Sequence, residues 1–515
     1  MMKNPADAGH PIRARLISNA FFIFIDWFSL SLFSFLYWFI IGKTLLPEEY
    51  GIVYVFHNVT VIVASLLPLG TSISLFKLIP EYIHNKQFGK ITSSIRFTLK
   101  LLIATTLITS LIILIFSNAI STLLKIPRFL VLLLPVSLFS YAIFSHQASI
   151  MQGFQHIRKL AITSAIGQIL KAVIAGILVY ANMSFFGPII GFIASSLILV
   201  VIRGSYLLYN KNPVKIDGKE LVLKFGVSAL FDRISLLLLT SSASLILALF
   251  YTPEVVGIFG VAMLIGGQLS LVPTIFSFAM FPITSMLASS TRMEKRQSYL
   301  INSVFRYTLL ITLPIITFVT LFSGKLITLL SQESYLSGKP LIPILAVGSL
   351  LLGISIIFTR SLYAIGKTDI QRNLFISTSI VYLILSFTLA YMFSALGVAI
   401  AYAMSAFVLF VTSFVYLRKT LKFNLPFKSI KKIIIANIFS LGILYFLSNY
   451  ASNILVGTLY TILVGSFYLI LLLFIRFYTI DDINLLNAVS NRISFGKNLM
   501  RLMIKIISKY TERVK

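Results

Sequence analysis

Four ionisable side chains lie deep within long apolar stretches of this 515-residue chain: Asp26, Lys171, Asp232 and Arg233. A charged side chain at the centre of a bilayer costs about 3 kcal/mol on insertion scales, so a charge kept at that depth points to a function. Asp26 and Asp232 lie 206 residues apart and equally deep in their stretches. These residues predict either a charged, water-lined cavity or buried ion pairs that lock helices together.

Small polar residues accompany these charges at helical spacing, which places each set on one helix face. One set lies around Asp232 and the other around Lys171: Ser228, Asp232, Ser235 and Ser242; Ser164, Gln168, Lys171 and Ala175. Such stripes favour the cavity.

The composition decides what surrounds the charges. Hydrophobic residues make up 58% of the chain and charged residues only 11%, with a mean hydropathy of +0.96. A soluble protein carries roughly 25% charged residues, so a soluble enzyme is excluded, and so is a disordered chain. The absence of cysteine excludes disulfides and thiol catalysis, and with only five histidines and few acids we expect no metal site. The composition predicts an all-α polytopic membrane protein.

A membrane-spanning helix needs about 20 apolar residues. The chain contains fourteen such stretches, near 17–42, 50–76, 93–117, 129–151, 160–181, 187–209, 223–250, 256–287, 301–323, 340–362, 373–394, 396–416, 431–449 and 454–477.

Lys and Arg residues are distributed unequally between the two sides of these spans. Of the 43, 36 fall on the side that holds both termini and five on the other side. The positive-inside rule therefore predicts that both termini are cytoplasmic, and the net charge of +28 reflects topology rather than nucleic-acid binding. The tail 478–515 has apolar and basic residues at helical spacing, which predicts an amphipathic helix on the anionic inner leaflet, with a solvated basic tail as the alternative.

Two segments recur at the 206-residue spacing. Leu46–Ile52 (LPEEYGI) corresponds to Thr252–Ile258 (TPEVVGI), and Phe116–Leu124 corresponds to Phe322–Leu330. Six spans are therefore repeated as six more in parallel orientation, which is an arrangement found in transporters that rock two lobes around a central site. The predicted units are an N-lobe (1–209), an inter-lobe loop (210–222), a C-lobe (223–420), two additional spans (421–477) and the tail (478–515).

The Pro-Glu-x-x-Gly segments, together with Phe225-Gly226 and Asp232-Arg233, resemble those of the polysaccharide flippases, a branch of the multidrug/oligosaccharidyl-lipid/polysaccharide exporter superfamily. Fourteen spans also resemble the lipid II flippases, in which the extra pair forms a lipid-facing groove. The resemblance covers roughly residues 15–420. It implies export of a polyprenyl-linked oligosaccharide by alternating access, with a monomer sufficient and the cell membrane as location.

Under this resemblance, the intramembrane charges acquire roles. Arg233 and Lys171 would attract the cargo's diphosphate, and the planar fork of Arg suits two phosphate oxygens at once. Asp232 belongs to the same cavity, and Asp26 would couple transport to Na⁺ or H⁺, because related drug exporters use a carboxylate in their first helix in this way. No other cofactor is expected.

Several polar residues extend the predicted site. Within the spans, Gln168, His57, Asn58 and Gln268 could face sugar hydroxyls, although helix-to-helix hydrogen bonds explain them as well. His146 and Arg360, 214 residues apart, could form an inner gate or a phosphate entry point, or could be interface side chains that reach toward water.

Two other classes of protein stay open. The first is a cation-coupled drug exporter, although a cationic drug would favour a cavity dominated by carboxylates. The second is a membrane-embedded polysaccharide polymerase or glycosyltransferase, but such enzymes use acidic or histidine-containing external loops. The acids predicted to be external are Glu48, Glu49, Glu254 and Glu333, and three of them lie in the repeated Pro-Glu segments. We therefore expect a transporter rather than an enzyme.

Overall fold

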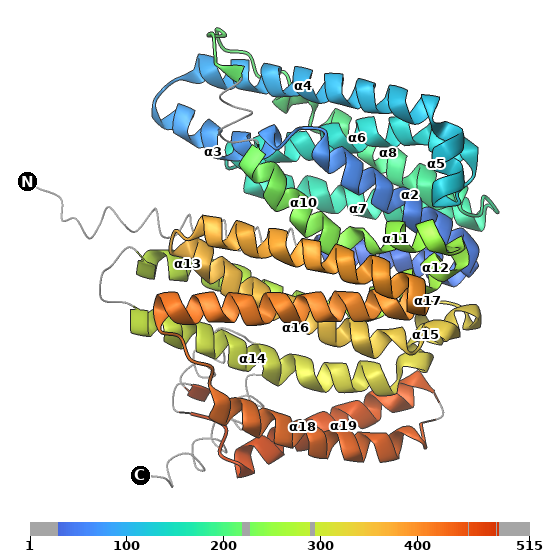
Figure 1. Ribbon diagram of the computed structural model, residues 1–515, viewed down its shortest axis with the longest axis vertical. Helices are drawn as coiled ribbons and strands as arrows, with labels where there is room; N and C mark the ends of the chain where they lie inside the picture. Colours follow the sequence, from blue (N-terminus) through green and yellow to red (C-terminus); the bar gives the residue numbers. More distant parts are fainter. Residues whose placement is uncertain (1–28, 219–226, 289–293, 452, 480–481, 484–515) are drawn as a thin grey trace, which may run out of the picture.

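The structure is a computed structural model of the chain, and it describes residues 29–218, 227–288, 294–451, 453–479 and 482–483 (Figure 1). Within these ranges every regular element is helical, as the composition predicts. Asp26 and most of the basic tail lie outside the described residues. Asp232 lies in a described helix, but its side chain is not described.

The first group of helices, the N-lobe, begins with the helix Ser29–Thr44. It continues with α2 (Pro47–Leu66), α3 (Thr71–His84), α4 (Phe88–Ile115), α5 (Ser117–Leu124), α6 (Arg128–Gly153), α7 (Ile157–Tyr180), α8 (Phe186–Ile202) and the 3₁₀ turn η1 (Gly204–Tyr206).

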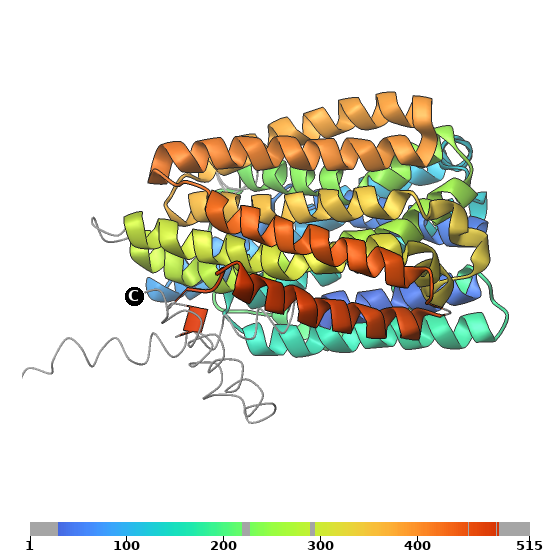
Figure 2. The same cartoon turned by 90° about the horizontal axis from the view of Figure 1, so that it is seen from below.

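The second group, the C-lobe, comprises α10 (Val227–Ser241), α11 (Ala243–Phe250), α12 (Pro253–Gly266), η3 (Gly267–Ser270), α13 (Leu271–Ala288), α14 (Glu294–Leu321), α15 (Ser323–Leu330), η4 (Glu333–Gly338), α16 (Leu341–Ala364) and α17 (Thr368–Leu421). Two more helices, α18 (Phe427–Ser448) and α19 (Ile454–Phe474), follow it. At the far side of the C-lobe, α18 packs against α14, and α19 packs against α18 and α15 (Figures 1 and 2).

The described helices account for the fourteen predicted spans. Ten are long and apolar enough to cross a membrane, the bent pair α10–α11 adds one, and the helices 29–44 and 186–202 are apolar but shorter. The fourteenth comes from α17, whose 54 residues would extend about 80 Å, far more than a bilayer core of about 30 Å. Its backbone leaves the helical region at Ser394 (φ 54°, ψ −137°), so α17 is two antiparallel spans.

Three predicted spans differ in detail from the helices observed. The span predicted over 50–76 is broken after α2, where Leu69 and Gly70 both have positive φ. The span predicted over 223–250 bends by 54° between α10 and α11. The span predicted over 187–209 ends at Ile202, because the chain tightens into η1 there. Apolar composition predicts where a segment crosses the membrane, but it does not report such breaks.

The internal repeat is visible in the helix boundaries. Two helices of the C-lobe begin 206 residues after their N-lobe counterparts: α12 after α2, and α15 after α5. The helices α14 and α15 also end 206 residues after α4 and α5. Two copies of one six-span unit therefore form the two lobes.

The lobes meet where α2 and α12 begin, and we call this end of the molecule the Pro-Glu end. The two helices cross with their backbones in direct contact: a Cβ atom on Gly51 would lie 1.7 Å from the carbonyl oxygen of Pro253, and one on Gly257 would lie 1.9 Å from that of Pro47. Only glycine permits this approach, because any side chain would overlap the opposite backbone. The recurring glycine of the Pro-Glu-x-x-Gly segments is thus explained by the lobe contact.

Candidate functional site

A polar cavity of about 120 Å³ lies within the N-lobe and contains three of the predicted site residues, His57, Gln168 and Lys171. Helix 29–44, α2, α6, α7 and α8 supply its walls. The lining residues are Ser34, His57, Tyr141, Phe144, Ser164, Gly167, Gln168, Lys171, Phe192, Ser195, Ser196 and Leu199. The volume accommodates a few water molecules or one small ion, but not a sugar chain.

Lys171 is the only charged residue among those lining residues, and it is 5% exposed. Its ammonium lies 4.3 Å from the ring centroid of Tyr37, whose hydroxyl donates a hydrogen bond to the carbonyl of Pro188 at 3.1 Å. A cation held against an aromatic face in a desolvated site gains about 2 kcal/mol. Among the described residues that line the cavity there is no Asp or Glu, so this part of the lining favours an anion.

His57 of α2 also lines the cavity, and its ring centroid lies 5.4 Å from that of Trp38 and 4.6 Å from that of Phe192. Asn58 does not line the cavity, but His57 Nδ1 and Gln168 Oε1, which do, are buried without a hydrogen-bond partner among the described residues. Buried polar atoms are normally partnered, so these atoms require water or a ligand. The cavity is therefore equipped for a small polar occupant.

The structure does not bring Arg233 into this cavity. Its guanidinium extends from α10 in the C-lobe toward α2 in the N-lobe, with Nη2 3.4 Å from the hydroxyl of Ser65. Gln268 lies half-buried in η3 of the C-lobe and does not line the cavity either. The single site that the sequence predicts is thus divided between an N-lobe cavity and a lobe-to-lobe contact.

The pair His146 and Arg360 lies within the lobes. His146 is fully buried, and its two ring nitrogens lie 2.7 Å from the hydroxyl of Ser72 and 3.3 Å from that of Thr98. Arg360 stacks on Phe278, with its guanidinium carbon 3.5 Å from the ring centroid. Because both ring nitrogens of His146 already have hydrogen-bond partners, we do not include His146 in the proposed site in this conformation.

Hydrogen bonds between the lobes reinforce the contact at the Pro-Glu end. Lys43 Nζ donates to the carbonyls of Thr328 (2.7 Å) and Ser331 (3.1 Å). The hydroxyl of the buried Tyr335 donates to Leu45 O at 2.9 Å, and Lys125 reaches a carbonyl of the C-lobe at 2.9 Å. In this structure the two lobes are joined at that end.

Three features of the site have only a weak signal in the sequence. Tyr37 and Trp38 read as ordinary membrane aromatics, and Arg203 reads as a loop cation because apolar composition continues to residue 209. In the structure Arg203 is 1% exposed and caps α8. The adjacent Gly204 was the available signal for a helix end, because glycine often follows a helix.

Comparison with known proteins supports the architecture. A family model described as "Polysaccharide biosynthesis protein" matches residues 40–340, which is more than half of the chain. An uncharacterized membrane protein of Methanocaldococcus jannaschii is 23% identical over 416 residues, covering 75% of this chain and 80% of the relative.

Two solved structures share the fold. One is the lipid II flippase MurJ in an inward closed conformation (TM-score 0.71, 18% identity), which covers 88% of this chain and 99% of MurJ. The other is a MATE family multidrug resistance transporter of the MOP superfamily in an inward-facing conformation (TM-score 0.61, 17% identity, 76% and 94% covered). The resemblance noted in the sequence is confirmed, and the chain belongs to the polysaccharide biosynthesis protein family.

Proposed function

We propose that this protein moves a polyprenyl-diphosphate-linked oligosaccharide from the cytoplasmic to the outer leaflet by alternating access. The family is defined by polysaccharide biosynthesis, and the solved structures with this fold are named as a flippase and a transporter. Parallel repeats that form two lobes are the usual basis for a rocking mechanism.

The observation that carries the proposal is the crossing of Gly51 and Gly257 at the Pro-Glu end. Related helices from the two lobes meet there backbone to backbone, and Lys43 and Tyr335 add hydrogen bonds across the same contact. We propose that this joint, the contact between α2 and α12, opens as a single unit when the lobes move apart. Opening this joint would expose a site between the lobes to the side of the membrane on which the Pro-Glu end lies.

The cargo is inferred from charge. The described residues that line the cavity of Lys171 include no carboxylate, and Arg233 projects from one lobe toward the other. Because the N-lobe cavity is too small for a glycan, Arg233 is the better placed of the two to meet a diphosphate carried between the lobes. Lys171 would then make the interior of the N-lobe favourable for an anionic group. We also propose that Asp232 belongs to the site and that Asp26 couples transport to Na⁺ or H⁺.

The proposed setting is a cell membrane, with the Pro-Glu end outside and both termini in the cytoplasm, in accordance with the distribution of Lys and Arg. The basic tail would lie on the inner leaflet, and a monomer with two lobes suffices for transport. We propose a transporter without catalytic activity.

The cargo is tested by reconstituting the protein into liposomes with lipid-linked oligosaccharide extracted from host membranes, and by measuring its appearance in the outer leaflet. Arg233→Ala should abolish this movement, whereas Arg418→Ala, an exposed arginine of α17, should leave it intact. Unchanged movement in Arg233→Ala would remove that residue from the site. Export of a cationic dye with no movement of the glycolipid would favour the drug exporter, the function named for the MATE relative.

Alternating access is tested by disulfides, because the chain has no cysteine of its own. A Cβ on Gly42 would lie 3.4 Å from that of Ser331 in the opposite lobe, which is close to disulfide geometry. Oxidation of Gly42→Cys/Ser331→Cys should stop transport reversibly. The matched pair Gly338→Cys/Ala262→Cys, at 3.8 Å within the C-lobe, should not. Transport that survives the first cross-link would contradict opening at this end.

A further inference from the structure

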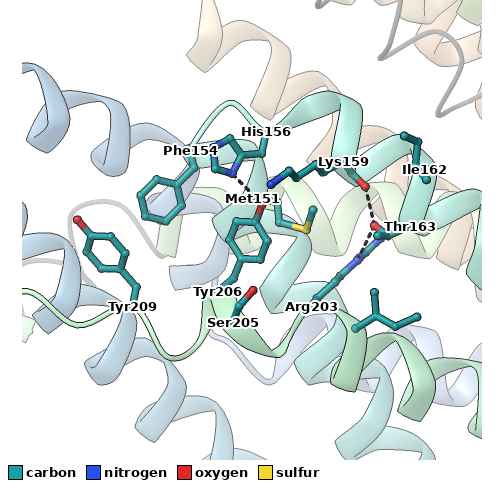
Figure 3. Close-up of a pocket in the computed structure, with 11 residues that line it drawn as sticks. Met151, Phe154, His156, Lys159, Ile162, Thr163, Arg203, Ser205, Tyr206 and Tyr209 are labelled. Carbon is teal, nitrogen blue, oxygen red and sulfur yellow. Dashed lines mark hydrogen bonds between the residues drawn. The ribbon is translucent and has the colours of Figure 1, made fainter.

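A second, larger cavity of about 510 Å³ lies at the opposite end of the N-lobe from the Pro-Glu end, where α6 ends and α7 begins (Figure 3). Its size is within the range of small-molecule sites. The residues that line it come from α6, α7, α8 and η1 and from the loops beside them, and they include His156, Lys159, Ile162, Ile202, Arg203 and Tyr206.

Three nitrogen-bearing side chains converge on this cavity, and no Asp or Glu is among its lining residues. Arg203 is held in place, since Nε donates to Thr163 Oγ1 at 2.9 Å, Nη2 donates to Ser164 Oγ at 3.0 Å, and the guanidinium lies 4.8 Å from the ring centroid of Phe144. A fixed, buried guanidinium is a ready-made receptor for phosphate oxygens.

Lys159 and His156 complete the polar side. Figure 3 shows Lys159, in the first turn of α7, directed toward the contact of His156 Nδ1 with the hydroxyl of Tyr206, which measures 2.7 Å. Burial and the neighbouring ammonium of Lys159 lower the pKa of His156, so that at neutral pH its ring is uncharged and Lys159 and Arg203 supply the charge. Tyr206 and His156 add groups that hydrogen-bond to an oxyanion or an ester oxygen.

The remaining side of the cavity is apolar and open. Ile162 and Ile202 are 51% and 47% exposed, and they project from helices that span the membrane. A ligand that fits both halves has a phosphate at one end and hydrocarbon at the other. A free phosphate would leave the apolar half without contacts.

We propose that this pocket binds the phosphate-bearing head group of an anionic membrane lipid, with its acyl chains lying along Ile162 and Ile202. Basic pockets between membrane helices near the cytoplasmic face recognise such head groups. The assignment to the cytoplasmic leaflet uses the orientation proposed above. Head-group binding is measured without transport, so the two proposals can fail separately.

The pocket also adjoins the N-lobe cavity. Ser164 and Phe144, the partners of Arg203, line the cavity that holds Lys171. A lipid bound to Arg203 would therefore be separated from that cavity by a single layer of side chains.

The test is native mass spectrometry of the full-length protein with phosphatidylglycerol, with phosphatidylcholine of the same acyl chains, and with inorganic phosphate. Phosphatidylglycerol should bind in preference to phosphatidylcholine, and Lys159→Gln should weaken it about fivefold, as expected for one lysine near an anionic head group. Lys367→Gln, an exposed lysine at the corresponding helix start in the C-lobe, is the matched control and should bind as the unaltered chain does. Arg203→Lys, which keeps the charge and loses the planar fork, should also weaken binding.

Equal binding of the two phospholipids would overturn the proposal. So would a preference for phosphatidylglycerol that is undiminished in Lys159→Gln. Binding of inorganic phosphate as tight as that of phosphatidylglycerol would assign the pocket to a soluble anion instead of a lipid.

Discussion

The two lobes share one fold but differ in their interiors. At the repeat spacing of 206 residues, Tyr37, Trp38 and His57 of the N-lobe correspond to Ala243, Ser244 and Met263 of the C-lobe. At the later spacing of 214, Lys171 and Gln168 correspond to Leu385 and Tyr382, and Tyr382 is fully buried. The repeat has kept several helix boundaries and the crossing glycines, whereas Lys171, the cation of the polar cavity, is replaced by Leu385 in the second copy.

The outer faces differ as well. Helices α4 and α14 occupy equivalent positions, but α14 is covered by α18 and α19, whereas α4 leaves a row of apolar side chains exposed, including Leu107, Ile108 and Leu111. The two lobes thus share one set of helices, and each has a feature of its own. The N-lobe has the buried Lys171, and the C-lobe has the outer helix pair α18 and α19. We therefore expect the shared parts to serve the proposed motion of the lobes, and the unshared parts are the candidates for cargo and partner recognition.

Substitution of the crossing glycines, which the two lobes share, should have the largest effect on transport. Gly51→Ala would place a Cβ atom 1.7 Å from the backbone oxygen of Pro253, and no side-chain rotation can relieve a clash with the backbone. We therefore expect the Pro-Glu end to fail to close and transport to be lost. Gly257→Ala should behave in the same way. Gly442→Ala in α18, where no atom lies within 4 Å, is the control and should be neutral. Normal transport in Gly51→Ala would show that this contact is not needed in the cycle.

Replacing residues of the N-lobe cavity by those at the corresponding positions of the C-lobe should have the next largest effect on transport. Lys171→Leu copies the C-lobe residue and removes the cation, and we expect transport to fall by about tenfold or more, since a hydrogen bond to a charged group is worth about 1.5–3 kcal/mol. The melting temperature should not fall, because a buried ammonium without a lining carboxylate is costly.

Gln168→Tyr, the second exchange of this kind, fills the cavity without changing its charge. Transport assays on both variants therefore separate the role of charge from that of space. Full activity in Lys171→Leu would mean that the cavity serves packing alone.

Much of this architecture is predictable from the sequence, because apolar length and the recurrence of Pro-Glu-x-x-Gly are local properties. The stripe Ser164, Gln168 and Lys171 also lies on one wall, as its spacing predicts. The approach of His57 to that stripe depends on how α2 packs against α7 and α8, which no local pattern encodes. For the same reason the sequence predicts one site for Arg233 and Lys171, whereas Arg233 is not among the residues that line the cavity of Lys171.

The outer face of α14 offers a matched test of smaller size. Arg306 Nη2 lies 2.9 Å from Asp482 Oδ2, with both side chains largely buried, and its counterpart on α4, 206 residues earlier, is the exposed Lys100. Removing one partner of a buried ion pair costs about 3 kcal/mol. Arg306→Ala should therefore lower the melting temperature and increase proteolysis after α19, whereas Lys100→Ala should do neither. Equal effects of the two substitutions would show that the ion pair does not hold the additional helices.

The same contact should depend on pH over a narrow range. Burial by itself would raise the pKa of Asp482, but hydrogen bonds from Tyr307 and Thr479 and the charge of Arg306 outweigh it and hold the pKa below its ordinary value. Because the folded state favours the carboxylate, this stabilisation is complete above about pH 5 and is lost as the pH falls through and below about 4. The difference in melting temperature between the unaltered chain and Asp482→Asn should therefore be constant from pH 8 to pH 5 and shrink on further acidification. A difference that persists unchanged at pH 3 would mean that shape, and not charge, attaches the C-terminal helices to the C-lobe.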